Sequence, residues 1–117
     1  DLVEAPNRYL GGAITIGPQT AADALAARTA KLPRIDLVPP RAAVGKNTLE
    51  ALRSGLVLGY AALVEGMVRR FKEEAGEALV IATGGFAETL RPICPSFDVV
   101  DEDLTLKGLL RIHRAQG

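Results

Sequence analysis

Residues Ala78-Leu79-Val80-Ile81-Ala82-Thr83-Gly84-Gly85 form a continuous apolar run of strand length that ends in a threonine and two glycines. Continuous apolarity predicts a buried strand of a parallel sheet. The sequence then predicts a short helix over 86–90. A strand that turns on glycines into a helix leaves bare N–H groups at the carboxyl edge of a sheet, where α/β proteins bind phosphates and nucleosides. Thr83, Gly84 and Gly85 therefore predict either a ligand-binding turn or only a tight turn.

A long helix is predicted upstream of this strand, from Asn47 to about Glu74. Its apolar positions follow helical spacing: Leu49, Leu52, Leu56, Leu63, Met67 and Phe71. Asn47 is the expected N-cap, and Glu50 completes a capping-box-like pair. The Thr48 hydroxyl then lies free beside unsatisfied N–H groups at the positive end of the helix dipole. This arrangement suits an anion or polar ligand, although a capped surface helix without a ligand fits the same residues.

The pair Gly45-Lys46 does not belong to a P-loop. A P-loop requires a glycine where this chain has Pro40, and a serine or threonine where it has Asn47. Pro39 and Pro40 also separate the loop from any preceding strand. A P-loop site is therefore excluded.

Three glycines lie inside the predicted long helix, at Gly55, Gly59 and Gly66. Each costs about 1 kcal/mol relative to alanine in a helix interior. Gly55 and Gly59 are four residues apart and share a face, which predicts close helix–helix packing within the domain or between subunits. The alternative is a helix that kinks or breaks at Gly59.

The remaining pattern predicts a mixed sheet flanked by helices on both faces, which defines an α/β fold class. The expected elements are a hairpin over 2–10 with its turn at Pro6-Asn7, strands over 11–17, 35–38 and 97–100, a helix from Thr20 to about Ala30, and a last helix capped by Asp103 or Thr105. The paired Gly11-Gly12 marks a close approach by another backbone or a ligand.

Composition narrows the function classes. The 117 residues suffice for one domain, and 14 basic residues balance 14 acidic ones, so no net field favours nucleic acid or anionic lipid. The sequence shows neither a secretory segment nor a continuous apolar run near 18 residues. With a single cysteine, Cys94, this favours a cytoplasmic setting. Cys94 is expected to be a buried or incidental thiol.

No metal site is predicted. The acidic cluster Asp98, Asp101, Glu102 and Asp103 lacks the glycine and distal glutamate of a calcium loop. His113 has no partner at ligand spacing and is expected at the surface. The chain starts at Asp1 with strand-like residues and no initiator methionine, which predicts a piece of something longer.

Several blocks together resemble the type III pantothenate kinases, also classed as Bvg accessory factor-like proteins. The matching blocks are Tyr9–Ile14, Arg28–Arg34, Val44–Thr48, Ser54-Gly55 with Gly59-Tyr60, Ala82–Gly85 and Asp103–Gly108. None is specific alone, but their order and spacing extend over nearly the whole chain.

The resemblance implies the acetate and sugar kinase, Hsp70 and actin superfamily, whose domains share a ribonuclease H-like fold. It implies transfer of the γ-phosphate of ATP to pantothenate, the first step of coenzyme A synthesis. Mg²⁺ and a monovalent cation (K⁺ or NH₄⁺) would be required. The enzyme would be a homodimer with the pantothenate pocket near the subunit contact.

Carried over by residue, the resemblance assigns Thr48 to a hydrogen bond with pantothenate, with Asn47, Gly12 and Ile14 as further substrate-binding positions. It assigns Thr83, Gly84 and Gly85 to the adenosine turn, and Gly55 and Gly59 to the dimer contact. One departure is Ile16, which stands where the family often has proline.

A larger departure is the lack of the family's phosphate-binding Asp-x-Gly-Asn-Thr, its Gly-x-Asp-Arg with the catalytic aspartate, and its Asp-Phe-Gly-Thr cation loop. Residues 1–117 are therefore expected to be the C-terminal ribonuclease H-like domain of a two-domain kinase, with no catalytic or metal residue in this chain and no activity alone. The alternatives are a Bvg accessory factor-like transcriptional regulator and a non-enzymatic oligomerisation module.

Overall fold

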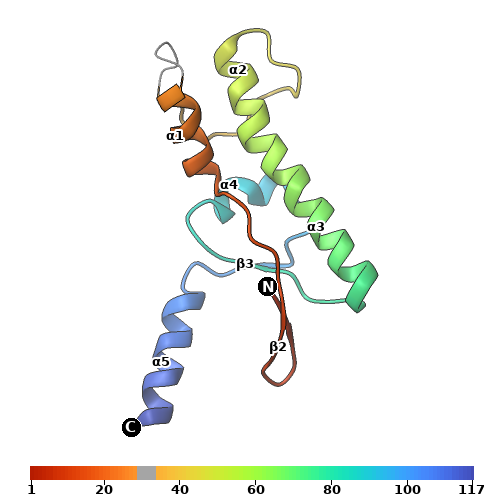
Figure 1. Ribbon diagram of the computed structural model, residues 1–117, viewed down its shortest axis with the longest axis vertical. Helices are drawn as coiled ribbons and strands as arrows, with labels where there is room; N and C mark the ends of the chain where they lie inside the picture. Colours follow the sequence, from red (N-terminus) through yellow and green to blue (C-terminus); the bar gives the residue numbers. More distant parts are fainter. Residues whose placement is uncertain (29–33) are drawn as a thin grey trace.

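The computed structural model describes residues 1–28 and 34–117, which form a mixed α/β arrangement built around one long helix (Figure 1). The N-terminal elements are β1 (Leu2–Glu4), β2 (Arg8–Gly11) and α1 (Pro18–Arg28). The long helix consists of α2 (Thr48–Arg53), η1 (Ser54–Leu58) and α3 (Gly59–Ala75). The C-terminal elements are β3 (Ile81–Ala82), α4 (Ala87–Leu90), η2 (Arg91–Ile93), β4 (Val99–Val100) and α5 (Leu104–Gln116).

The N-terminal hairpin is confirmed, because β1 and β2 pair antiparallel. The strand predicted to continue over 11–17 is wrong. Gly11 has a φ of 125°, a conformation that L side chains rarely adopt, and the strand ends there. The predicted close approach is confirmed at Gly12, where an added Cβ would lie 3.0 Å from the Cα of Asp1.

The pairing direction predicted for the strand over 78–82 is confirmed, because β3 pairs parallel with β4. Its predicted length and burial are wrong. Two residues form the strand, and the side chains of Leu79 and Ile81 are 67% and 46% exposed. Within residues 1–28 and 34–117, β3 has no second strand neighbour that could cover it, since the sheets are two-stranded.

The strand predicted over 35–38 is also wrong. The N–H of Val38 donates to the carbonyl of Asp36 at 3.0 Å, so this segment turns back on itself instead of extending. Pro39 and Pro40 follow, and neither has an N–H for a strand ladder. Ile35 is nevertheless buried.

The long helix is continuous from Thr48 to Ala75, as predicted. It does not break at Gly59, which has helical dihedrals of −61° and −41°. Its irregularity is η1, a π-helical turn in which the Gly59 N–H donates to the carbonyl of Ser54. The helix ends before Gly76, which has a φ of 91°.

The helix Thr48–Ala75 is long and apolar enough to span a membrane, and the mean hydropathy of its most apolar window is 1.3. The lack of a continuous apolar run near 18 residues did not predict this. Only 17% of its most apolar window is buried. One such helix does not define a membrane protein, because core helices of soluble proteins have the same length and hydropathy.

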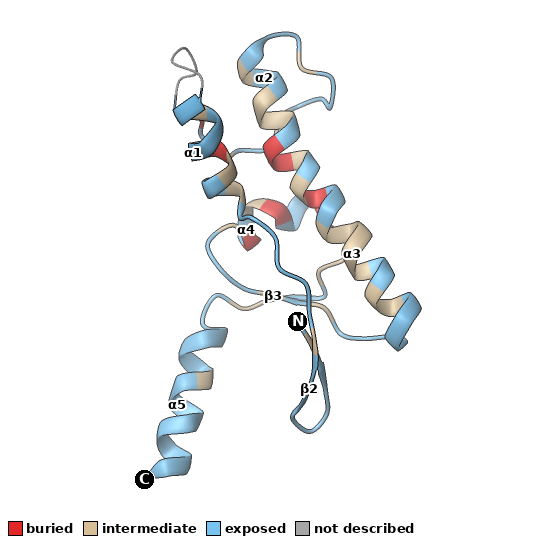
Figure 2. Cartoon of the chain, viewed as in Figure 1, coloured by how far each residue is buried: buried red, intermediate tan, exposed pale blue. Residues whose placement is uncertain are grey.

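The core is small and lies where the long helix meets α1 and α4 (Figure 2). Two clusters compose it: Val57, Ala61, Leu90 and Cys94 in one, and Ala22, Ile35 and Leu56 in the other. The expectation of a buried thiol is confirmed at Cys94, which is 1% exposed. Burial raises the pKa of this thiol, and the nearby Glu65 carboxylate adds to the effect.

Both predicted caps outside the long helix need correction. The first helix begins at Pro18, with the Ala21 N–H bonded to the carbonyl of Gly17, so Thr20 lies in its first turn and does not cap it. The predicted end of this helix lies outside the described residues. At α5, Asp103 occupies the N-cap position, as one of the two alternatives predicted, but its side chain makes no cap hydrogen bond, and Thr105 lies inside the helix. The Asp101 carboxylate accepts from the Asp103 N–H at 3.0 Å.

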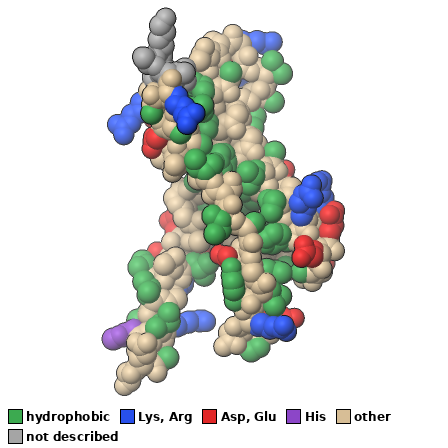
Figure 3. All heavy atoms as spheres, in the orientation of Figure 1, with side chains coloured by type: hydrophobic (Ala, Val, Ile, Leu, Met, Phe, Trp, Pro, Cys, Tyr) green, Lys and Arg blue, Asp and Glu red, His purple; other side chains and the backbone are tan. Residues whose placement is uncertain are grey.

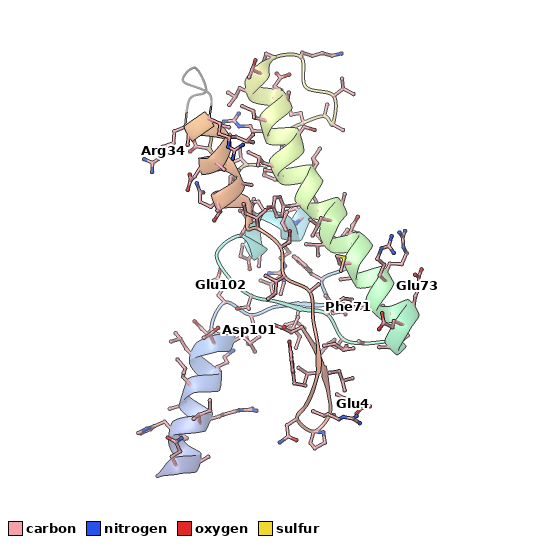
Figure 4. All side chains as sticks on the ribbon, in the orientation of Figure 1. Glu4, Arg34, Phe71, Glu73, Asp101 and Glu102 are labelled. Carbon is pink, nitrogen blue, oxygen red and sulfur yellow. The ribbon has the colours of Figure 1, made fainter. Side chains whose placement is uncertain are left out.

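Asp101 also pairs with Lys107, whose Nζ lies 2.8 Å from Oδ2, at the start of α5 (Figure 4). The hydrogen bond from Lys107 lowers the pKa of Asp101, and the same bond raises the pKa of Lys107. α5 projects away from the rest of the chain (Figure 1), and His113 on it is exposed, as expected.

Candidate ligand-binding sites

The start of the long helix has the cap that the sequence predicts, with one difference. The Asn47 Oδ1 accepts from the Glu50 N–H at 2.9 Å, which confirms the N-cap. Glu50 Oε2 accepts from the N–H of Lys46 at 2.7 Å, one residue earlier than a capping box requires. The Thr48 side chain is exposed and makes no hydrogen bond to any described residue. Its hydroxyl therefore remains available for a ligand at the helix N-terminus.

Gly45 holds this loop against the helix, a role that sequence reasoning missed. A Cβ at Gly45 would lie 2.3 Å from the Ala51 nitrogen, so only glycine allows the loop to pack there. The Ser54 hydroxyl adds a hydrogen bond to the carbonyl of Ala43. The sequence feature that could have indicated this role is the position of Gly45, directly before Lys46 and the Asn47 cap.

A hollow of about 490 Å³ opens beside this loop. Three cationic side chains line it, Arg41, Lys46 and Arg53, together with the Glu50 carboxylate. Positive charge next to a helix N-terminus favours an anionic group. Thr48 does not line the hollow itself.

The diglycine turn after β3 has the geometry that requires glycine. Gly84 has a φ of 100°, and its carbonyl accepts from the Ala87 N–H at 3.2 Å. A hollow of about 440 Å³ lies against this turn, lined by Gly85, Phe86 and Thr89 on one side and by residues 17–20 and Leu37 on the other. The structure thus places the start of α1 opposite the predicted adenosine turn.

Tyr60 is a second contributor that sequence reasoning missed, and it ties the two sides of this hollow together. Its ring packs edge-on against Phe86, with ring centroids 6.5 Å apart. Its hydroxyl donates a hydrogen bond to the carbonyl of Ile16. Because the acceptor is a backbone carbonyl, the proline that the family often has in place of Ile16 would retain it. The signal in the sequence was Tyr60 following Gly59 in one matching block.

The predicted sites do not form one pocket. Thr48 and Asn47 lie at the beginning of the long helix, and Tyr60, which contacts Phe86, follows about 18 Å further along its axis. Gly12 and Ile14 lie elsewhere, where Ile14 is fully exposed and lines a third hollow with α3. Thr48 and the adenosine turn are therefore separate within a single chain.

Gly55 and Gly59 are exposed, and a Cβ added at either would meet no atom within 4 Å. Among the described residues, nothing packs closely on this face. The structure thus gives no support to the within-domain contact, one of the two alternatives for these glycines.

No three acidic, histidine or cysteine side chains gather to hold a metal ion in the part of the chain that the structure describes.

A glycine turn after a parallel strand, facing a helix N-terminus, is a kind of sheet edge at which many α/β proteins bind phosphorylated ligands. The family model described as type III pantothenate kinase matches residues 1–70. The chain belongs to the type III pantothenate kinase family.

Three relatives, each named type III pantothenate kinase, match almost the whole chain. A protein of Thermus thermophilus is 92% identical over 117 residues, which is 100% of this chain and 46% of the relative. The protein of Deinococcus radiodurans is 53% identical over 113 residues, 96% of this chain and 43% of the relative. The protein of Thermomicrobium roseum is 48% identical over 122 residues, 100% of this chain and 47% of the relative. The chain spans about half the length of these relatives.

Proposed function

We propose that this chain is the C-terminal half of a kinase that transfers the γ-phosphate of ATP to pantothenate, the first step of coenzyme A synthesis. The observation that carries this proposal is the 92% identity, over the whole chain, to a relative named type III pantothenate kinase. The three relatives described above are all named type III pantothenate kinase, which does not favour the transcriptional-regulator alternative.

The hollow beside Gly85 is the proposed place for the nucleotide. Thr83, Gly84 and Gly85 would present backbone groups to the adenosine end of ATP, and Phe86 would supply an apolar wall. The hydroxyls of Thr20 and Thr89 lie in residues that line the same hollow and can donate to ribose or phosphate oxygens.

The start of the long helix is the proposed place for pantothenate, through Thr48 and Asn47. The unpaired Thr48 hydroxyl, the helix dipole and the cations Arg41 and Lys46 together suit a hydroxy acid with a carboxylate. Gly12 and Ile14, proposed as further substrate contacts, lie apart from this place in one chain.

The rest of the catalytic apparatus is proposed to lie in the other half of the protein. A kinase needs metal placement and charge stabilisation around the transferred phosphoryl group. The described residues hold no group of three or more acidic, histidine or cysteine side chains that could bind a metal ion, and the cation ligands and the catalytic aspartate would come from an N-terminal domain. The 117-residue chain alone would be inactive, and the two domains would each have a ribonuclease H-like fold.

The complete enzyme is proposed to be a cytoplasmic homodimer that contacts its partner through Gly55 and Gly59. The support is the open space around both glycines. Each glycine destabilises the helix relative to alanine, and no close contact among the described residues compensates for this loss. A close helix–helix contact between subunits would supply that return. The distance of Thr48 from the adenosine turn fits a pantothenate pocket near such a contact.

Complementation tests the proposal. The 117-residue chain, expressed together with the remaining half of the Thermus thermophilus relative, should phosphorylate pantothenate, whereas each half alone should not. Thr48→Ala should raise the KM for pantothenate, and Thr105→Ala, which changes another exposed threonine, on α5, should leave it unchanged. Turnover by the 117-residue chain alone would refute the proposal that the catalytic residues lie in the other half. A lack of turnover by the combined halves would refute the kinase function.

A further inference from the structure

The strap, residues 43–47, runs back beside the first turns of the long helix (Figure 1). The end of the strap nearest the helix start is held twice. The Lys46 N–H donates to Glu50 Oε2 at 2.7 Å, and Gly45 packs against the Ala51 nitrogen. Both contacts lie close to the N-cap, so they leave the other end of the strap without an attachment.

That other end is held by Ser54, whose hydroxyl donates to the carbonyl of Ala43. Asn47, Ala51 and Ser54 are four and three residues apart, so they share one face of the helix, and the strap follows this face. A serine inside a helix commonly bonds back to a carbonyl of its own helix. The Ser54 hydroxyl instead fixes a separate segment of the chain.

The helix is irregular at the same residue. The π-helical turn η1 begins at Ser54, whose carbonyl accepts from the N–H of Gly59. Single π-helical turns inside α-helices are frequent at functional sites. The turn therefore supports a role for Ser54 beyond that of a residue on a surface helix.

The strap and its neighbours carry the polar groups at the start of the long helix. Arg41 precedes the strap and Lys46 belongs to it, and both are exposed and line the hollow of about 490 Å³. Figure 3 shows a basic side chain projecting at the end of the molecule where α2 begins. Asn47, the last residue of the strap, caps α2 and is joined directly to Thr48. The position of the strap therefore decides how these groups lie relative to one another.

We propose that Ser54 is a positioning residue for the pantothenate site. It holds the strap against α2, which keeps Asn47 in the capping position and the first helical turn, beginning at Thr48, in place. Ser54 does not contact the substrate itself but acts through the Ala43 carbonyl and the strap. The inference rests on the proposed function, in which Thr48 contacts pantothenate.

Loss of the Ser54 hydroxyl should loosen the start of the helix. The first N–H groups of a helix have no partner within it and depend on caps. The Glu50 N–H is one of them, and it bonds to Asn47 Oδ1 at 2.9 Å. A strap released at Ala43 moves with a larger amplitude, and Asn47 lies at its other end. The cap then opens more often, and the Thr48 hydroxyl is less often in place.

The kinetic test uses the full-length relative of Thermus thermophilus, with residues 1–117 of this chain in place of the 92% identical segment. Ser54→Ala should raise the KM for pantothenate roughly threefold to tenfold, the range expected for the loss of one such hydrogen bond. The KM for ATP should stay unchanged, because the hollow at the adenosine turn lies further along the helix, where Tyr60 contacts Phe86. Ser54→Thr retains a hydroxyl and should keep the KM of the unsubstituted enzyme.

Three kinetic results would overturn the proposal. A purely stabilising role of Ser54 would lower the Tm of the Ser54→Ala variant without changing either KM. Equal rises in the KM for pantothenate and the KM for ATP would show a general disturbance of the protein. An equal rise in the KM for pantothenate in Ser54→Thr would assign the effect to packing at this position and not to the hydroxyl.

Amide hydrogen exchange gives a readout that needs no substrate. The Lys46 and Glu50 amides, whose hydrogen bonds hold the strap and the cap, should exchange roughly threefold to tenfold faster in Ser54→Ala. Ser96→Ala is the matched control, because Ser96 is another half-buried serine and lies beside the later turns of α3. It should change neither amide and neither KM. Unchanged exchange of both amides in Ser54→Ala would contradict the assignment.

The two measurements separate this proposal from the proposed function. If the unsubstituted full-length protein does not phosphorylate pantothenate, the kinase function is refuted, and amide exchange alone decides whether Ser54 positions the strap. If the protein does phosphorylate pantothenate and Ser54→Ala leaves the KM for pantothenate unchanged, the positioning role alone is refuted.

Discussion

Gly45→Ala should unfold the start of the long helix, because Gly45 packs so closely on the backbone of Glu50 and Ala51 that no side chain fits. The new Cβ would lie 2.3 Å from the Ala51 nitrogen and 2.6 Å from the Glu50 carbonyl carbon, and neither atom can move without disturbing the helix. The loop must therefore shift away and weaken the cap bonds of Asn47 and Lys46. Overpacking costs about 1–3 kcal/mol and a lost cap about 1 kcal/mol, so we expect a loss of about 2–4 kcal/mol.

Thermal denaturation followed by far-ultraviolet circular dichroism measures this loss, with an expected fall in Tm of roughly 10 °C for a chain of this length. Gly66→Ala is the matched control, because a Cβ there meets nothing within 4 Å. Alanine at that helix-interior position should raise stability by up to about 1 kcal/mol. If Gly45→Ala left the stability unchanged, or if Gly45→Ala and Gly66→Ala lowered it equally, the close packing at the start of the helix would not be what stabilises this part of the protein.

Three further outcomes are expected. Tyr60→Phe keeps the ring against Phe86 but removes the hydrogen bond to the Ile16 carbonyl, so it should lower the free energy of unfolding by about 1 kcal/mol. In the complete enzyme it should raise the KM for ATP and leave the KM for pantothenate unchanged. The hydrogen bond from Lys107 lowers the pKa of Asp101, so the ionised Asp101 stabilises the folded protein at pH values above the ordinary aspartate range. This stabilisation should disappear as the pH falls through the lowered pKa, and NMR titration of α5 should show the loss. In the Asp101→Asn variant the pH dependence should be absent. Burial raises the pKa of Cys94, so its thiol should react with an alkylating reagent far more slowly in the native protein than in denaturant; equal rates would contradict its burial.

Local features were predictable wherever neighbouring residues decide them. The hairpin over 2–10, the Asn47 cap and the long helix to Ala75 were all expected from sequence, since turn residues, a capping amide and helical spacing act over a few positions. The π-helical turn at Ser54–Leu58 was not, because no local rule distinguishes a wider turn inside a regular apolar pattern.

The site was only partly predictable for the same reason. The turn conformation of Gly84 follows from its sequence, whereas the position of Gly85 opposite Gly17 depends on how α1 packs against the long helix. Gly45 was missed because the Ala51 nitrogen comes close to it only through the packing of the loop on the helix. Tyr60 was missed because its partner, the Ile16 carbonyl, is 44 positions away in the sequence.

The amino-acid order alone determined the helices, the hairpin, the parallel direction of β3 and the family to which the chain belongs. Tertiary structure alone decided that Thr48 and the diglycine turn lie apart, and that Leu79 and Ile81 are exposed beside an open groove. The physical reason is that propensity and periodicity report which side chains avoid water, but not which surface covers them. At Leu79 and Ile81, no described residue of this chain forms that cover.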